Sequence, residues 1–127
     1  SQRMKKLTLI FSLTMFSSTC FAEWTKVSED IYGTNYVDFD GLQKVDGFVY
    51  FWELNNYPKP SRGYLSNKWY HQVDCKLLLV KHSRLSFHTE PMGKGTGETI
   101  GHQDEWKSIS PNSVEEIVLK KICNDTN

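Results

Sequence analysis

The sequence has no long hydrophobic run and no excess of charge of either sign, and each absence excludes a class of protein. The apolar segment Leu7–Phe16 spans only ten residues, well short of the roughly 20 that a helix needs to cross a bilayer. The 15 basic residues are matched by 15 acidic ones, whereas a general nucleic-acid binder would be expected to be basic. We therefore expect neither a transmembrane segment nor a nucleic-acid partner.

Motifs of catalysis are also missing. The stretch Gly93–Gly97 has neither the spacing of a phosphate-binding loop nor a helix after it, and no serine lies in a Gly-x-Ser-x-Gly turn. The carboxylates Asp38, Asp40, Glu53 and Glu90 are scattered along the chain. We predict that the protein is not an enzyme and has no catalytic, cofactor-binding or metal-binding residues. A hydrolase is kept as a distant alternative, which would require polar groups converging in a pocket.

The four histidines form no recognisable metal motif. They are His71, His82, His88 and His102. None has helical i, i+4 spacing or lies in a Cys/His knuckle, and strand geometry places His82 and His88 about 20 Å apart on one face. An alternative that stays open is that one histidine ligates haem, with aromatic residues as walls.

The first 22 residues have the composition of a secretory signal peptide. A basic start with Lys5 and Lys6 precedes the apolar run, and the segment ends in the small residue Ala22, as a cleavage site requires. We predict that residues 1–22 are removed and that 23–127 form a single exported domain, periplasmic or secreted. Removal takes three basic residues and no acidic one, so the domain has 12 basic minus 15 acidic residues, or −3.

Cysteine is scarce, with three residues in the chain. Cys20 falls in the predicted leader, where Ser17 and Thr19 occupy positions that lipoprotein signals usually give to a large aliphatic and a small residue, so we predict no lipid anchor. The remaining pair, Cys75 and Cys123, is expected to form a disulfide in an oxidising compartment. Closing that loop stabilises the fold by an estimated ~4 kcal/mol in the chain-entropy model.

Alternating apolar residues predict an antiparallel sheet of about six strands. The expected strands are 23–27, 35–39, 47–57, 64–75, 76–89 and a short one within 97–109. The two long strands meet near Cys75, Pro58–Gly63 is predicted as a loop, and 90–98 as a mobile loop. The apolar pattern of 76–89 changes midway, which predicts either a β-bulge or a strand that leaves the covered region of the sheet.

Ser110–Cys123 is the one clear helix of the sequence. Ser110 is expected to cap it, Pro111 to occupy its first position, and Lys120 and Lys121 to lie in its last turn. The expected apolar stripe is Val114, Ile117, Val118 and Ile122. We predict that this stripe packs on one face of the sheet and that the disulfide tethers the helix there.

A weakly basic stripe is the candidate binding surface. His82, Arg84 and His88 share one strand face if alternation is uninterrupted. Arginine and aromatic residues are enriched at interfaces. The predicted partner-binding residues are Lys68, Trp69, Tyr70, His82, Arg84 and His88.

Several segments, taken in order, resemble the surface-adhesin protein E family of small exported Gram-negative proteins. They are Phe21-Ala22-Glu23-Trp24, Tyr36-Val37-Asp38, Trp52-x-Leu54-x-x-Tyr57, Tyr64-Leu-Ser-Asn-Lys68 leading to Asp74-Cys75, Glu90-Pro-Met-Gly93, Glu105-Trp106, and Pro111-x-Ser113-Val114 with a helix ending in Cys123. The resemblance covers essentially the whole predicted domain.

The resemblance implies the same fold, with the C-terminal helix held by the Cys75–Cys123 bridge. It also implies a non-enzymatic, homodimeric binding protein whose ligands are host extracellular-matrix or plasma proteins, with haem binding in addition. The adhesin that names the family is lipid-anchored, and this leader departs from it. The alternative function is a periplasmic small-ligand or haem-binding protein that uses His71, His82 or His88 beside Trp69 and Tyr70.

Overall fold

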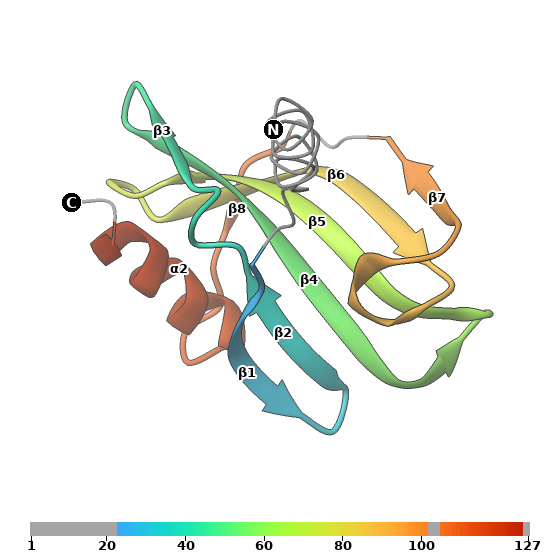
Figure 1. The fold of residues 1–127 in the computed structure, drawn as a ribbon. Coiled ribbons are helices and arrows are strands. Elements are labelled where there is room, and N and C mark those ends of the chain that lie inside the picture. Colours follow the sequence, from blue (N-terminus) through green and yellow to red (C-terminus); the bar gives the residue numbers. More distant parts are fainter. Residues whose placement is uncertain (1–22, 102–104, 126–127) are drawn as a thin grey trace, which may run out of the picture.

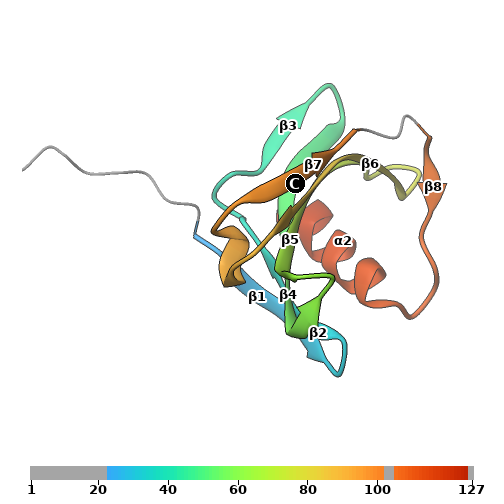
Figure 2. The same cartoon turned by 90° about the vertical axis from the view of Figure 1, so that its right-hand side faces the viewer.

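A computed structural model describes residues 23–101 and 105–125 as one twisted antiparallel sheet with a helix across one face (Figures 1 and 2). The elements are β1 (Thr25–Asp30), β2 (Gly33–Val37), β3 (Gln43–Val45), β4 (Phe48–Ser61), β5 (Tyr64–Asp74), β6 (Leu79–His88), the 3₁₀ turn η1 (Pro91–Gly93), β7 (Gly97–Ile100), β8 (Lys107–Ser108) and α2 (Val114–Asp125). The main strand order is β1-β2-β4-β5-β6-β7. The predicted fold class is confirmed, with short β3 and β8 bringing the described strands to eight. The predicted leader, residues 1–22, lies outside the described residues.

The core lies between the sheet and α2. Alternation along β4 turns Val49 and Phe51 toward the helix, and both are about 1% exposed. They pack with buried residues of the neighbouring strands and of the helix, namely Val37, Val73, Val80, Val118, Leu119 and Ile122. Burying each such side chain contributes about 1.5–3 kcal/mol, so these contacts hold the helix against the sheet.

The predicted disulfide joins this helix to the turn between β5 and β6. Cys75 and Cys123 are bonded, with their Cα atoms 5.6 Å apart. Cys123 belongs to the same buried cluster as the helix residues. The bridge therefore fastens the C-terminal end of α2 at the edge of the core.

Helix α2 begins later than predicted. Asn112 has a left-handed φ of +60°, so the chain around Pro111 forms a turn. Ser113, rather than Ser110, caps the helix, because its Oγ accepts a hydrogen bond from the amide of Glu116 at 3.1 Å. The apolar stripe of the helix also differs in one position. Ile117 was expected to be buried but is 60% exposed, and Leu119 is buried instead. The helix continues to Asp125, so no basic residue lies in its last turn.

Strand β4 runs through the segment predicted as a loop. It continues past Pro58 and Pro60 to Ser61, which pairs with Tyr64 of β5. Strand β2 pairs with β4 only as far as Asn56, and the β4–β5 register is irregular between Asn56 and Ser61. Proline is tolerated at such edges and irregularities because no ladder hydrogen bond is lost there. The prediction of a loop over Pro58–Gly63 was therefore wrong, because it treated both prolines as strand breakers without knowing which strands pair beside them.

The predicted bulge is present, and it decides which side chains share a face. Tyr70 pairs with Arg84 and His71 with His82, so Ser83 is the extra residue of β6. Paired residues point to the same face of a sheet, and the next pair points to the opposite face. Arg84 therefore lies on the face away from α2, and His82 lies on the face that α2 covers.

Candidate functional site

The face of the sheet opposite α2 carries most of the predicted binding residues. Trp52, Tyr70 and Arg84 form one row across β4, β5 and β6, because Trp52 pairs with Tyr70 and Tyr70 with Arg84. Lys68 and Ser86 are paired in the next row. These side chains come from the central strands of the sheet, whose long ladders hold them in fixed relative positions.

A hollow of about 430 Å³ runs across this face from β4 to β7. It is lined by Trp52, Lys68, Arg84, Ser86, His88, Gly97 and Thr99, and we call these residues the basic trough. A second hollow of about 310 Å³ shares Arg84 and Thr99 with it. The lining contains two permanent cations and none of the chain's described carboxylates, so the trough is suited to an anionic group.

Trp52 is the aromatic residue that lines the basic trough, and the ring of Tyr70 packs against it, with Tyr50 beyond. The Lys68 Nζ lies 5.6 Å from the centroid of the Trp52 ring. The centroid of the Tyr70 ring lies 4.8 Å from that of Trp52 and 6.1 Å from that of Tyr50. Burial and the neighbouring Tyr50 raise the pKa of Tyr70, with Arg84 acting in the opposite direction. The Tyr70 hydroxyl therefore keeps its proton and can donate a hydrogen bond to a ligand.

His88 lies at the floor of the trough, where it is buried. Its Nε2 lies 2.8 Å from Ser86 Oγ, and burial, followed by the charge of Lys68, lowers its pKa, so the ring is neutral at physiological pH. Gly97 makes room for this ring, since a Cβ there would lie 2.6 Å from the Phe87 carbonyl oxygen and 2.9 Å from His88 Nδ1.

The segment after β6 packs against β4 and β5, and its first part is held by hydrogen bonds. Ser66 Oγ donates to the Glu90 carbonyl at 2.7 Å and accepts from the Gly93 amide at 2.9 Å. The Met92 amide donates to Asn56 Oδ1 at 2.8 Å. The predicted mobile loop thus contains η1, which hydrogen bonds fasten to β4 and β5.

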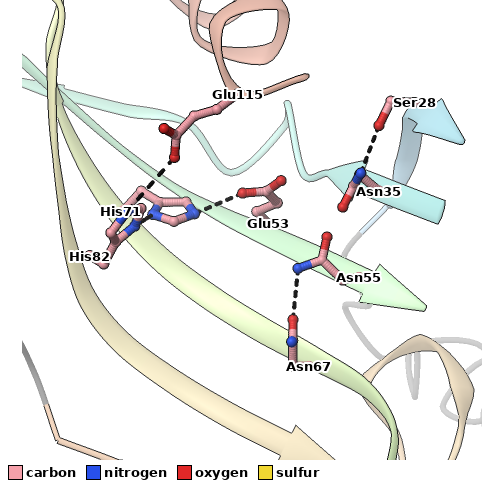
Figure 3. A network of polar contacts seen from close by, with 8 residues as sticks. All are labelled: Ser28, Asn35, Glu53, Asn55, Asn67, His71, His82 and Glu115. Atoms are coloured by element: carbon pink, nitrogen blue, oxygen red, sulfur yellow. Dashed lines mark hydrogen bonds and ion pairs between the residues drawn. The ribbon is translucent and has the colours of Figure 1, made fainter. Parts of the chain in front are cut away.

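Two of the predicted residues, Trp69 and His82, lie on the other face and cannot join this surface. There His71, 3% exposed, connects three strands and the helix in a polar network (Figure 3). Its Nε2 lies 2.8 Å from Glu53 Oε1, and its Nδ1 lies 2.8 Å from His82 Nδ1. His82 Nε2 is 3.7 Å from Glu115 Oε2 on α2.

The network has a consistent proton arrangement. Because an ionised carboxylate only accepts, His71 Nε2 donates to Glu53; when His71 is neutral, its Nδ1 accepts from His82 Nδ1. His82 then presents a lone pair to Glu115, which suits a protonated carboxyl group. Burial is the main cause that lowers the pKa of His82 to about 4, and burial raises the pKa of Glu115. Both shifts favour the uncharged forms of His82 and Glu115.

The pairing of His71 with His82 was missed in the sequence, although a signal for it is present. The Asp74 carboxylate accepts hydrogen bonds from the amides of Lys76 and Leu77, which fixes a tight turn. Counting outward from that turn pairs His71 with His82. The described histidines, cysteines and carboxylates contain no group of three that could hold a metal ion. The fourth histidine, His102, lies outside the described residues, and no helix within them is long and apolar enough to span a membrane.

The fold and its surface define a small α+β domain in which a disulfide-tethered helix covers one sheet face and the other is left open for contact. The chain belongs to the surface-adhesin protein E family, whose model matches residues 24–124. This confirms the family predicted from the sequence.

Solved structures of Haemophilus influenzae protein E have the same fold. One, of crystal form II, is 18% identical with a TM-score of 0.67 and covers 84% of this chain and 91% of its own. A second is 19% identical with a TM-score of 0.65 and covers 84% and 88%. A comparison with curated proteins gives no match. At these identities the structural likeness establishes the fold, and the chemistry has to be argued from this chain's own residues.

Proposed function

We propose that this protein is an exported, non-enzymatic binding protein of the adhesin E type that binds host extracellular-matrix or plasma proteins through the basic trough and the aromatic residues beside it. The observation that carries the proposal is the placement of Lys68 and Arg84 beside Trp52 and Tyr70 on the face that α2 leaves open. Arginine, tryptophan and tyrosine are the residues most enriched at protein interfaces.

The physical roles of these residues differ. Arg84 is exposed and supplies charge that attracts an acidic partner and orients it during encounter. Trp52 and Tyr70 are half-buried, and each side chain has only two χ angles, so they offer contact area at a small cost in conformational entropy. His88 supports the floor of the trough. Trp69 and His82 are left out of the proposed surface because they face the helix.

The test is binding of residues 23–127 to immobilised laminin, vitronectin and plasminogen over a salt series. We expect saturable binding that weakens with salt, because charges near an exposed surface are screened over about 8–10 Å at physiological ionic strength. Arg84→Glu is expected to reduce binding at low salt. Lys120→Glu makes the same charge change on the opposite face, where Lys120 is 61% exposed, and is expected to leave binding unchanged. Equal loss in both variants would reduce the effect to net charge and contradict the proposed surface.

A small anionic ligand is the second candidate, because the trough volume of about 430 Å³ falls in the range of small-ligand sites. Haem is the specific version of this alternative. Of the histidines considered for it, His71 has both ring nitrogens engaged in hydrogen bonds, and His88 lies in the trough. A Soret band that appears with haemin and is lost in His88→Gln would support this function, and an unchanged spectrum would remove it.

A further inference from the structure

The two edges of the sheet are treated differently by the sequence. An edge strand exposes unpaired backbone groups, and proteins usually blunt it with a bulge, charges or proline. At the β1 edge, the register shifts between Lys26 and Ser28, and Glu29 and Asp30 follow. The β7 edge, Gly97–Ile100, pairs in regular register with β6. All four of its residues are exposed, and it carries neither bulge nor proline.

The backbone of β7 points one set of hydrogen-bonding groups outward. The Thr89 amide donates to the Thr96 carbonyl, so that pair is a hydrogen-bonded one in the β6–β7 ladder. Antiparallel pairs alternate between hydrogen-bonded and non-hydrogen-bonded. Glu98 and Ile100 therefore direct their amides and carbonyls toward β6, and Gly97 and Thr99 direct theirs to the outer edge, where no other described strand pairs.

Hollows of different chemistry flank this edge on its two faces. On one face Gly97 and Thr99 border the basic trough, which opens at the edge because neither has a long side chain. On the other face Glu98 and Ile100 border a hollow of about 500 Å³. It is also lined by three aromatic residues, Tyr57, Tyr64 and Phe87, and by Ser61 and Arg62. The Glu98 carboxylate there accepts a hydrogen bond from the Tyr64 hydroxyl at 3.0 Å. One side is thus cationic, and the other combines three aromatic rings and Ile100 with one charge of each sign, Arg62 and Glu98.

We infer that β7 receives an extended segment of a partner protein as an added strand, and that the segment alternates acidic with apolar residues. The side chains of an added strand point alternately to the two faces, so acidic ones reach the basic trough and apolar ones reach the aromatic hollow. Backbone hydrogen bonds to Gly97 and Thr99 supply affinity, and the hollows supply specificity, as in other cases of strand addition. The inference rests on the proposed function, because it specifies the kind of partner that the open face binds.

The probe is a fluorescein-labelled, eight-residue peptide of alternating glutamate and valine, followed by fluorescence anisotropy. Thr99→Pro removes the outward amide and leaves the β6 ladder intact, and edge strands tolerate proline there. We expect it to weaken peptide binding by roughly tenfold, from the loss of a hydrogen bond and the clash of the ring. Thr99→Val keeps the amide and the branched side chain, so it differs from Thr99→Pro chiefly in the backbone, and it is expected to bind the peptide more tightly than Thr99→Pro does.

Two matched peptides test the chemistry in the parent protein, so that the result does not depend on how Thr99→Pro folds. The first has the same composition but places glutamates and valines in consecutive pairs, so it cannot direct all glutamates to one face and all valines to the other. The second is N-methylated at every second residue and so lacks the amides needed for backbone hydrogen bonds to β7. Both are expected to bind at least tenfold more weakly. Equal binding of the paired and alternating peptides, equal binding to the two Thr99 variants, or no binding of the alternating peptide would overturn the inference.

The failure of this inference can be told apart from failure of the proposed function. If Arg84→Glu abolishes binding to the host proteins and Thr99→Pro does not, the trough is the binding surface and strand addition is wrong. If the alternating peptide binds through Thr99 and none of the host proteins binds, strand addition stands and the proposed class of partner is wrong.

Discussion

Acidification is expected to destabilise this protein through the buried histidine network. The pKa of His82 is about 4 in the folded protein, against an ordinary value of 6.5. The unfolded chain therefore binds a proton at this position at a higher pH than the folded chain does. Between pH 6.5 and pH 4 the unfolded state holds more protons, so the free energy of unfolding falls as the pH falls.

The size of this effect follows from the same two values. The difference between the two pKa values of His82 makes the free energy of unfolding about 3 kcal/mol lower at pH 4 than at pH 7. The His82 side chain is 18% exposed, and solvent screening reduces the expected loss to about 2 kcal/mol. Glu115 acts in the opposite sense, because burial raises its pKa and the folded state then takes up its proton first. It offsets part of the loss at pH values just above its ordinary pKa of 4.5.

The assay is urea unfolding of residues 23–127 at pH 7, 6, 5 and 4, with His82→Gln and Glu115→Gln as variants. Glutamine keeps an amide donor in place of the imidazole but cannot titrate. The parent is expected to lose about 2 kcal/mol more than His82→Gln between pH 7 and pH 4, and Glu115→Gln to lose stability more steeply than the parent. Equal losses in parent and His82→Gln would refute the reasoning.

Two further changes test the tether and the trough floor. Cys123→Ser is expected to lower stability by about 4 kcal/mol and to reduce the melting temperature under oxidising conditions; melting equal to that of the parent would contradict a stabilising disulfide. Gly97→Ala forces a Cβ against the Phe87 carbonyl and the His88 ring, and is expected to cost about 1–3 kcal/mol in thermal unfolding. Gly101→Ala, whose Cβ would meet nothing within 4 Å, serves as its control, and a similar cost in both would show that the close contact is not the cause.

Features with a local cause could be predicted from the sequence. Alternation identified the long strands, and the even number of cysteines outside the predicted leader identified the disulfide. The change of apolar pattern within β6 identified the bulge. In each case the information lies within a few neighbouring residues or in a count.

Features that depend on pairing with distant residues could not be predicted in the same way. Strand β4 tolerates Pro58 and Pro60 because its pairing with β2 stops at Asn56. The residues near the two prolines do not reveal where that pairing stops. The candidate site was divided between two faces because the position of the extra residue, Ser83, was not fixed. One residue of uncertainty in a strand is enough to turn every later side chain over.

The extra residue in β6 also has a consequence for how the two surfaces can diverge in evolution. Because Ser83 is absorbed in the bulge, deleting it would leave Arg84 facing away from α2 and Leu85 facing the helix, as they do now. Point substitutions can change the chemistry of one surface, whereas a single-residue insertion or deletion that no bulge absorbs would exchange the two. Alignments of relatives with less than 20% identity should therefore be anchored on strand pairing, because a gap misplaced by one position would assign a binding residue to the core.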